Sequence, residues 1–296
     1  MKQNLHKGSL ILLLTILFAA ACKKSIETQE PVTVGNYPHN TSLATQGVPF
    51  PVNPSQECNY APDYGDSIVY PQSPASNDYF VYPQNNQGLI GTYLSWPGGL
   101  EMDSKTGAID LTRSETGQRY AVAFVKTGTS DTCLSQLIVA GAAYMDSIYD
   151  LSISDTTAKP YFNANPYGPP ICQGSSGPGP GCQFDYNNYA HNQGIEVDQN
   201  TGFIDLKKSM QQSLFGILPI NGTTVMTTIY YKLNDNSNYA AQKIQLQMVY
   251  YNHRSDIPPG MLATVTNKLL NTLSDLLITK NPASSRPPII IIVRSH

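Results

Sequence analysis

Short runs in which apolar and polar residues alternate make up most of the chain after residue 63, and Pro, Gly and Asn separate one run from the next. Because successive side chains of a strand point to opposite faces, this period of two residues predicts strands with one buried and one solvated face. Many short strands at close spacing are typical of an all-β sandwich. The predicted strands cover residues 67–70, 79–82, 89–94, 120–125, 134–140, 225–233 and 243–251.

One stretch of thirteen residues occurs twice. It reads Gly-Leu-Glu-Met-Asp-Ser-Lys-Thr-Gly-Ala-Ile-Asp-Leu at residues 99–111 and Gly-Ile-Glu-Val-Asp-Gln-Asn-Thr-Gly-Phe-Ile-Asp-Leu at residues 194–206, an offset of 194 − 99 = 95 residues. Eight of the thirteen positions are identical, and two more exchange one aliphatic residue for another. This similarity predicts an internal duplication of a module of roughly 100 residues.

Each copy of the repeated stretch predicts a hairpin. Apolar residues alternate with acidic ones on both sides of a polar centre, which is the pattern of two strands joined by a turn. Asp103 and Asp198 can accept hydrogen bonds from backbone N–H groups two or three residues on. Gly107 and Gly202 can adopt the positive φ that closes such a loop.

The carboxylates of the repeated stretch also allow a calcium site or an acid/base pair. Glu101 lies two residues before Asp103, and Glu196 lies two residues before Asp198. Calcium takes six to eight oxygen ligands, which is more than such a pair offers. We therefore expect structural turns with no metal or other cofactor, and calcium stays open as the alternative.

Residues 94–111 resemble the signature of bacterial immunoglobulin-like and cadherin-like modules of cell-surface proteins. They read Leu-Ser-Trp-Pro-Gly-Gly-Leu-Glu-Met-Asp-Ser-Lys-Thr-Gly-Ala-Ile-Asp-Leu, and residues 119–125 supply the following segment rich in Tyr and Val. The second copy lacks the Trp-Pro-Gly lead-in and has Ala-His-Asn-Gln at residues 190–193 instead. The resemblance implies β-sandwiches used for display or adhesion, and it implies no catalytic residue.

The fold class that follows is mainly β, with two tandem immunoglobulin-like sandwich modules and a C-terminal amphipathic helix and strand. Leucine and valine recur at helical spacing in residues 261–278, and Asn281-Pro282 ends that pattern. Residues 289–293 are apolar on both faces, which predicts a buried strand or one that pairs with a partner chain. The predicted segments are a lipoprotein signal peptide at 1–21, a flexible tether at 22–62, the modules at 63–155 and 160–253, and the C-terminal helix and strand at 256–296.

The N-terminus predicts export and lipid attachment. Lys2 and Lys7 precede an apolar run over residues 10–21, whose last three residues are alanines directly before Cys22. This arrangement resembles the lipobox of bacterial lipoproteins, in which the cysteine is lipidated; an ordinary signal peptide is the alternative. Lys23 and Lys24 follow with no Asp beside them, which favours the outer membrane and leaves its face open. Membrane contact through a lipid anchor is therefore expected.

The cysteine count predicts disulfides. Besides Cys22 there are four cysteines, an even number in a chain expected to be exported. Cys172 and Cys182 flank a loop rich in Gly, Ser and Pro that a local bridge would close. Cys58 with Cys133 follows by elimination, and the other pairings stay open.

Charge and motifs exclude some classes of function. Only 13% of residues are charged and the formal net charge is −3, which argues against a nucleic-acid partner because such binding needs a concentrated basic face. None of the five histidines lies in a metal or nucleophile motif, and no nucleophile elbow or phosphate-binding loop occurs. We therefore expect a protein that is not an enzyme.

Two functions fit these features. The first is a lipid-anchored cell-envelope protein of non-enzymatic binding or adhesion type, with a protein or glycan partner left open. The alternative is a carbohydrate-binding accessory lipoprotein of a glycan-uptake system, in which Trp96, Tyr79 and Tyr82 stack on sugar rings. Tyrosine also favours strands for structural reasons alone, so these rings are weak ligand candidates.

Overall fold

The computed structural model describes residues 60–73, 78–86, 88–129, 132–153, 156–172, 181–274 and 287–295. The predicted signal peptide, Cys22 and the tether up to residue 59 lie outside these residues. The described residues belong to one compact unit, which is mainly β as the alternating pattern predicts. No helix within the described ranges is long and apolar enough to span a membrane.

The first repeat packs a four-stranded sheet, of order β1-β6-β5-β3, against a ribbon of β2 and β4. Its period-two pattern is clearest in β5, where Tyr120, Val122 and Phe124 are fully buried in the core. The strands are β1 (Ile68–Val69), β2 (Phe80–Val81), β3 (Gly91–Trp96), β4 (Ile109–Asp110), β5 (Gln118–Lys126) and β6 (Thr132–Val139).

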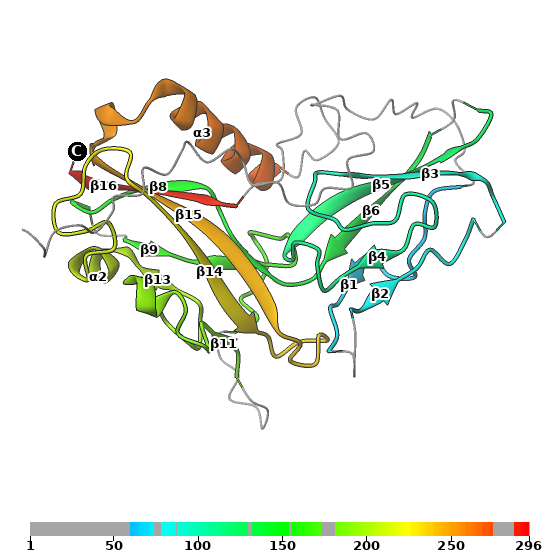
Figure 1. Cartoon of the computed structure of the whole chain (residues 1–296), viewed down its shortest axis with the longest axis horizontal. Helices are drawn as coiled ribbons and strands as arrows, with labels where there is room; N and C mark the ends of the chain where they lie inside the picture. The colour runs from blue at the N-terminus through cyan, green and yellow to red at the C-terminus, as the bar shows by residue number, and fades with distance from the viewer. Residues whose placement is uncertain are drawn as a thin grey trace, which may run out of the picture. The chain divides into compact units, whose positions relative to one another are not determined.

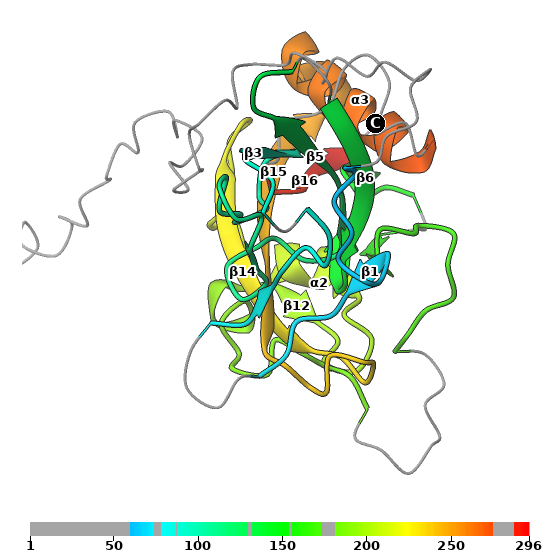
Figure 2. The ribbon, with the colours of Figure 1, turned by 90° about the vertical axis from the view of Figure 1, so that its right-hand side faces the viewer.

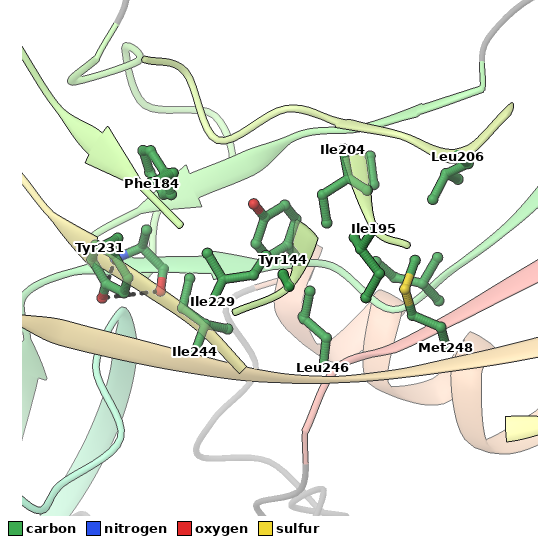
Figure 3. Packing of buried hydrophobic residues seen from close by; sticks show 14 of the residues in the cluster. Tyr144, Phe184, Ile195, Ile204, Leu206, Ile229, Tyr231, Ile244, Leu246 and Met248 are labelled. Carbon is green, nitrogen blue, oxygen red and sulfur yellow. Dashed lines mark hydrogen bonds between the residues drawn. The ribbon is translucent and has the colours of Figure 1, made fainter. Parts of the chain in front are cut away.

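The second repeat has a five-stranded sheet of order β11-β14-β15-β16-β8, a three-stranded sheet β12-β13-β9 and a pair β10-β7. Side chains of β14 and β15 point toward Tyr144, Ile195 and Ile204 from the other strands (Figure 3). The elements are β7 (Ala142–Tyr144), β8 (Ser147–Asp150), β9 (Thr157–Ala158), β10 (Pro160–Phe162), β11 (Gln183–Phe184), η1 (His191–Gln193), β12 (Glu196–Val197), β13 (Ile204–Asp205), α2 (Leu206–Gln211), β14 (Thr224–Lys232), β15 (Gln242–His253), η2 (Arg254–Asp256), α3 (Pro259–Ser274) and β16 (Ile289–Ser295).

The C-terminal strand β16 lies inside the second sheet. It pairs in parallel with β15 on one side and with β8 on the other. Its residues Ile289, Ile291 and Val293 are buried beneath α3, which lies over this part of the sheet in both views (Figures 1 and 2). The segment that is apolar on both faces is therefore a buried strand within its own chain.

Strand pairing divides the repeats differently from the predicted segments. The sequence analysis assigns residues 147–150 to the first module and residues 289–295 to a separate C-terminal segment, whereas β8 and β16 belong to one sheet of the second repeat. In the first repeat β1 pairs directly and in parallel with β6, so β16 is an extra strand of the second repeat. The pairing of β8 depends on a strand about 140 residues away, and no local pattern encodes it.

Hydrogen bonds join the two repeats at the segment that connects them. The Tyr231 hydroxyl lies 2.6 Å from the Thr116 hydroxyl and accepts the Ala142 N–H at 3.0 Å. Asn238, in the polar loop between β14 and β15, donates to the side-chain oxygen of Gln72 at 2.9 Å. Both ends of β14 and β15 that face the first repeat are therefore held by polar contacts.

Candidate functional site

The two aspartate corners have the same hydrogen bonds. Asp103 Oδ1 accepts the N–H groups two and three residues on at 2.9 and 2.7 Å, and Asp198 Oδ1 accepts the corresponding groups at 3.0 and 2.8 Å. The N–H of Thr106 holds the pKa of Asp103 below its usual value. Burial raises the pKa of Asp198, but hydrogen bonds from Thr201 and from the next N–H outweigh it and lower the pKa. One oxygen of each carboxylate is thus committed to closing its turn.

An aromatic ring lies against the glycine of each corner. Gly107 and Gly202 have φ of 72° and 75°, and a Cβ added to either would lie 2.7 Å from the ring of Tyr93 or Phe184, respectively. The N–H of each aromatic residue donates to the carbonyl of the residue after the corner aspartate, at 2.8 Å in the first repeat and 2.7 Å in the second. Backbone and ring therefore occupy equivalent places in both repeats.

A second shared contact comes from a phrase that the sequence analysis missed. Tyr64 donates its hydroxyl to the carbonyl of Gly107 at 2.7 Å, and Tyr144 donates to that of Gly202. The two tyrosines begin a Tyr-x-Asp-Ser-Ile phrase at residues 64–68 and 144–148, an offset of 144 − 64 = 80 residues. Burial raises the pKa of both hydroxyls, so they remain donors at any physiological pH.

Serines after the corners extend the shared geometry. Ser114 Oγ donates to the Asp110 carbonyl at 2.6 Å and accepts the N–H of Glu101 at 3.0 Å. Ser209 makes the same two bonds at 2.7 and 2.9 Å in the second repeat. These contacts serve the fold, and no group of three or more His, Cys, Asp or Glu within the described ranges is placed to hold a metal ion.

The repeats differ in the loop between the aromatic residue and the next shared glycine. This distance is 99 − 93 = 6 residues in the first repeat and 194 − 184 = 10 in the second, so the second loop is four residues longer. Asp185 holds the longer loop: its buried carboxylate accepts the N–H groups of Ala190 and His191, each at 2.9 Å. The inserted loop is therefore fixed from within.

This loop presents tyrosines to solvent. Tyr186 and Tyr189 are 38% and 45% exposed, and both meet Tyr230 of β14 edge to face, with ring centroids 6.5 and 5.8 Å apart. Lys232 Nζ lies 4.9 Å from the centre of the Tyr186 ring. We call these four residues, Tyr186, Tyr189, Tyr230 and Lys232, the tyrosine surface.

The tyrosine surface is equipped for recognition. Its rings offer large contact area at little cost in conformational entropy, because two χ angles fix each of them. Exposed amides of Asn187 and Gln199 lie on the same loop and on the neighbouring corner, where Gln199 Nε2 donates to the Asn188 side chain at 3.1 Å. The combination of tyrosine and asparagine in a rigid loop is typical of surfaces that bind a partner.

The structure separates the three aromatic residues predicted as ligand candidates. Tyr82 is 60% exposed and its ring lies 6.5 Å from that of Phe80. Tyr79 is half-buried and packs against the core of the first repeat. Trp96 is also half-buried, and its Nε1 is shielded from solvent with no hydrogen-bond partner. Of the three, Tyr82 is the one with a largely open ring face.

One of the expected disulfides is confirmed. Cys172 and Cys182 are bonded, with their Cα atoms 5.4 Å apart. Cys133 is also disulfide-bonded, while Cys58, its predicted partner, lies outside the described residues. The bridge closes a loop that begins ten residues before β11 and therefore ends directly beside the strand that leads into the inserted loop.

Comparisons with known proteins give only weak structural likeness. No protein-family model matches the chain, and no curated protein matches it significantly. Two structures of human protocadherin-24 EC1-2 match 62% of this chain and 92% and 93% of their own, at 9% and 8% identity and a TM-score of 0.21. Domains 3–5 of Drosophila OTK match 64% of each chain at 10% identity and a TM-score of 0.20. Because these scores lie far below 0.5, no function is carried over from these proteins.

Proposed function

We propose that this chain is a non-enzymatic binding protein of the cell envelope, anchored by lipid at Cys22 and presenting the tyrosine surface to its partner. The observation that carries the proposal is the inserted loop: it occurs in one repeat only, and the buried Asp185 carboxylate holds it with Tyr186 and Tyr189 exposed. A loop already fixed in shape loses little entropy when it binds, which favours recognition.

The anchor in this proposal rests on the sequence. The apolar run, the three alanines and Cys22 support lipid attachment, and the lysines after Cys22 support sorting to the outer membrane. Fatty-acid labelling of the full chain tests it: the parent takes up label and Cys22→Ala does not. Equal labelling of both proteins would contradict attachment at this cysteine.

A carbohydrate is the ligand class that we propose in second place. Sugar rings present apolar faces to aromatic side chains and hydroxyls to amides, and the tyrosine surface offers both kinds of group through Tyr186, Tyr189 and the Asn187 amide. The exposed pair of Phe80 and Tyr82 is a second aromatic surface in the first repeat. A protein partner fits the same rings, so the ligand class must be decided by experiment.

Binding of the full chain to a glycan array and to candidate envelope proteins tests the proposal. Tyr186→Ala with Tyr189→Ala should weaken binding at least tenfold, because tyrosines at the centre of an interface contribute about 2 kcal/mol or more each. Tyr167→Ala is the matched control, since Tyr167 is 75% exposed elsewhere on the second repeat. Equal losses in both variants, or hydrolysis of a bound glycan by the parent, would contradict the proposal.

A further inference from the structure

An apolar loop tip projects from the second repeat between α2 and β14, coloured yellow in Figure 1. Ile217 and Leu218 are each 89% exposed, and Ile220 is 73% exposed. Consecutive aliphatic side chains with almost no protein contact are unfavourable in water and rare on surfaces that stay solvated. We call Ile217, Leu218 and Ile220 the apolar tip.

The exposure of the apolar tip is a fixed feature of the loop. Before the tip, the Phe215 ring is buried 5.7 Å from the Tyr250 ring. After it, Thr223 donates its N–H and its hydroxyl to the Ile220 carbonyl at 3.1 and 2.8 Å, and the Gly222 N–H donates to the Tyr250 carbonyl at 2.8 Å. Both bases of the loop are thus attached to the sheet, and the tip is held outward between them.

The surroundings of the apolar tip carry no charge. Residues 209–231 contain no Asp, Glu, Lys or Arg, and the same 23 residues include the whole tip and most of β14. Charged side chains are costly inside a bilayer interface, whereas aliphatic and uncharged polar side chains are accepted there. A convex, uncharged, aliphatic tip is therefore suited to a lipid surface.

We propose that the apolar tip inserts into the boundary between headgroups and acyl chains of the membrane that carries the lipid anchor. A few aliphatic side chains bind lipid too weakly to hold a dissolved protein there, since even one long acyl chain binds only marginally. The anchor supplies the second attachment, and in this respect the inference rests on the proposed function.

The length of the tether makes the second contact feasible. From Cys22 to the first described residue, Tyr60, there are 60 − 22 = 38 residues. A flexible chain of this length spans about 30–35 Å on average. Such a tether holds the tip near the membrane at an effective concentration of about millimolar, so weak insertion suffices.

Insertion at the apolar tip would set the height of the tyrosine surface. The loop leads directly into β14 at Thr224, and Tyr230 lies 230 − 224 = 6 residues further along that strand. At about 3.3 Å for each residue of a strand, the two ends are about 20 Å apart. The tip would then rest on lipid while the tyrosines remain in water above it.

Tryptophan fluorescence in vesicles tests the inference. The full chain is reconstituted in phosphatidylcholine vesicles with plain or brominated acyl chains, as Leu218→Trp and as the control Ile90→Trp, whose position is 78% exposed in the first repeat. The parent, which contains only Trp96, supplies the background. We expect brominated lipid to quench at least half of the added Leu218→Trp emission and to leave that of Ile90→Trp unchanged.

Each other outcome is decisive. Equal quenching at both positions, or none at residue 218, overturns the inference. A blue shift at residue 218 that grows with protein concentration but not with bromine indicates contact with a second copy and also overturns it. Ile217→Asn with Ile220→Asn in the Leu218→Trp chain should reduce the quenching at least threefold. Loss of vesicle flotation in Cys22→Ala reports on the anchor separately, and quenching that persists when Cys22→Ala still floats would leave the tip supported and the proposed anchor contradicted.

Discussion

Alanine in place of Gly107 or Gly202 tests the shared corner of the two repeats. At φ of 72° and 75° an alanine is strained by about 1 kcal/mol relative to glycine. Its Cβ would also lie 2.7 Å from the Tyr93 or Phe184 ring, and inserting a methyl group into a packed core costs about 1–3 kcal/mol more. We expect each substitution to lower the free energy of unfolding by about 2–4 kcal/mol.

Gly222 provides the matched control. Its φ is 83°, but nothing lies within 4 Å of a Cβ placed there, so Gly222→Ala should lose only the backbone contribution of about 1 kcal/mol. Urea unfolding followed by circular dichroism and by tyrosine and tryptophan fluorescence measures all three variants. If the repeats unfold in separate transitions, each corner variant should shift its own. Stability of Gly202→Ala equal to that of Gly222→Ala would refute the close ring contact.

Three further predictions concern stability. Because the pKa values of Asp103 and Asp198 are lowered on folding, their contribution to stability is complete above the unfolded value near 3.9 and is lost as the pH falls through the lower folded values; Asp198→Asn should flatten the fall of the urea midpoint between about pH 5 and pH 2, and an unchanged slope would speak against it. Replacing Cys172 and Cys182 by serine should cost about 2–3 kcal/mol in denaturant unfolding under oxidising conditions, while the reduced parent should match the variant. Ile291→Ala, at a fully buried position, should cost about 2–5 kcal/mol in the transition of the second repeat, and hydrogen exchange in β5 should stay as in the parent.

Local pattern predicts the parts of this fold that depend on neighbours in sequence. The corners at Asp103 and Asp198 follow from residues within five positions, and the buried face of β5 follows from alternation alone. The contacts of Tyr64 and Tyr144 with the corners join residues about 43 and 58 positions apart. Sequence analysis failed to include them because the Tyr-x-Asp-Ser-Ile phrase is short and has a different offset from the longer repeat.

The place of the C-terminal strand shows the limit of local pattern. Residues 289–293 are apolar at every position, which predicts burial on both faces but leaves the neighbours open. The structure supplies β15 and β8 as those neighbours, and pairing on both sides satisfies the strand within its own chain. A role for this strand in docking to another chain has no free edge to use in this arrangement.

The candidate site was overlooked for a related reason. A search for what the repeats share finds turns, serines and buried rings, all of which serve the fold. The tyrosine surface lies where the repeats differ, in four residues added between Phe184 and Gly194. Comparing the spacing between shared positions in the two copies would have drawn attention to this loop.

Exchange of the inserted loop tests the central claim most directly. Residues 185–193 of the full chain are replaced by residues 94–98, the shorter loop at the equivalent place of the first repeat, and both urea unfolding and binding to the partner or glycan captured by the parent are measured. If the repeats share one frame and the inserted loop carries recognition, the exchanged chain unfolds cooperatively at a midpoint close to that of the parent and loses at least tenfold in affinity. A chain that does not fold would contradict the shared frame, and a folded chain that binds as the parent does would contradict the proposed site.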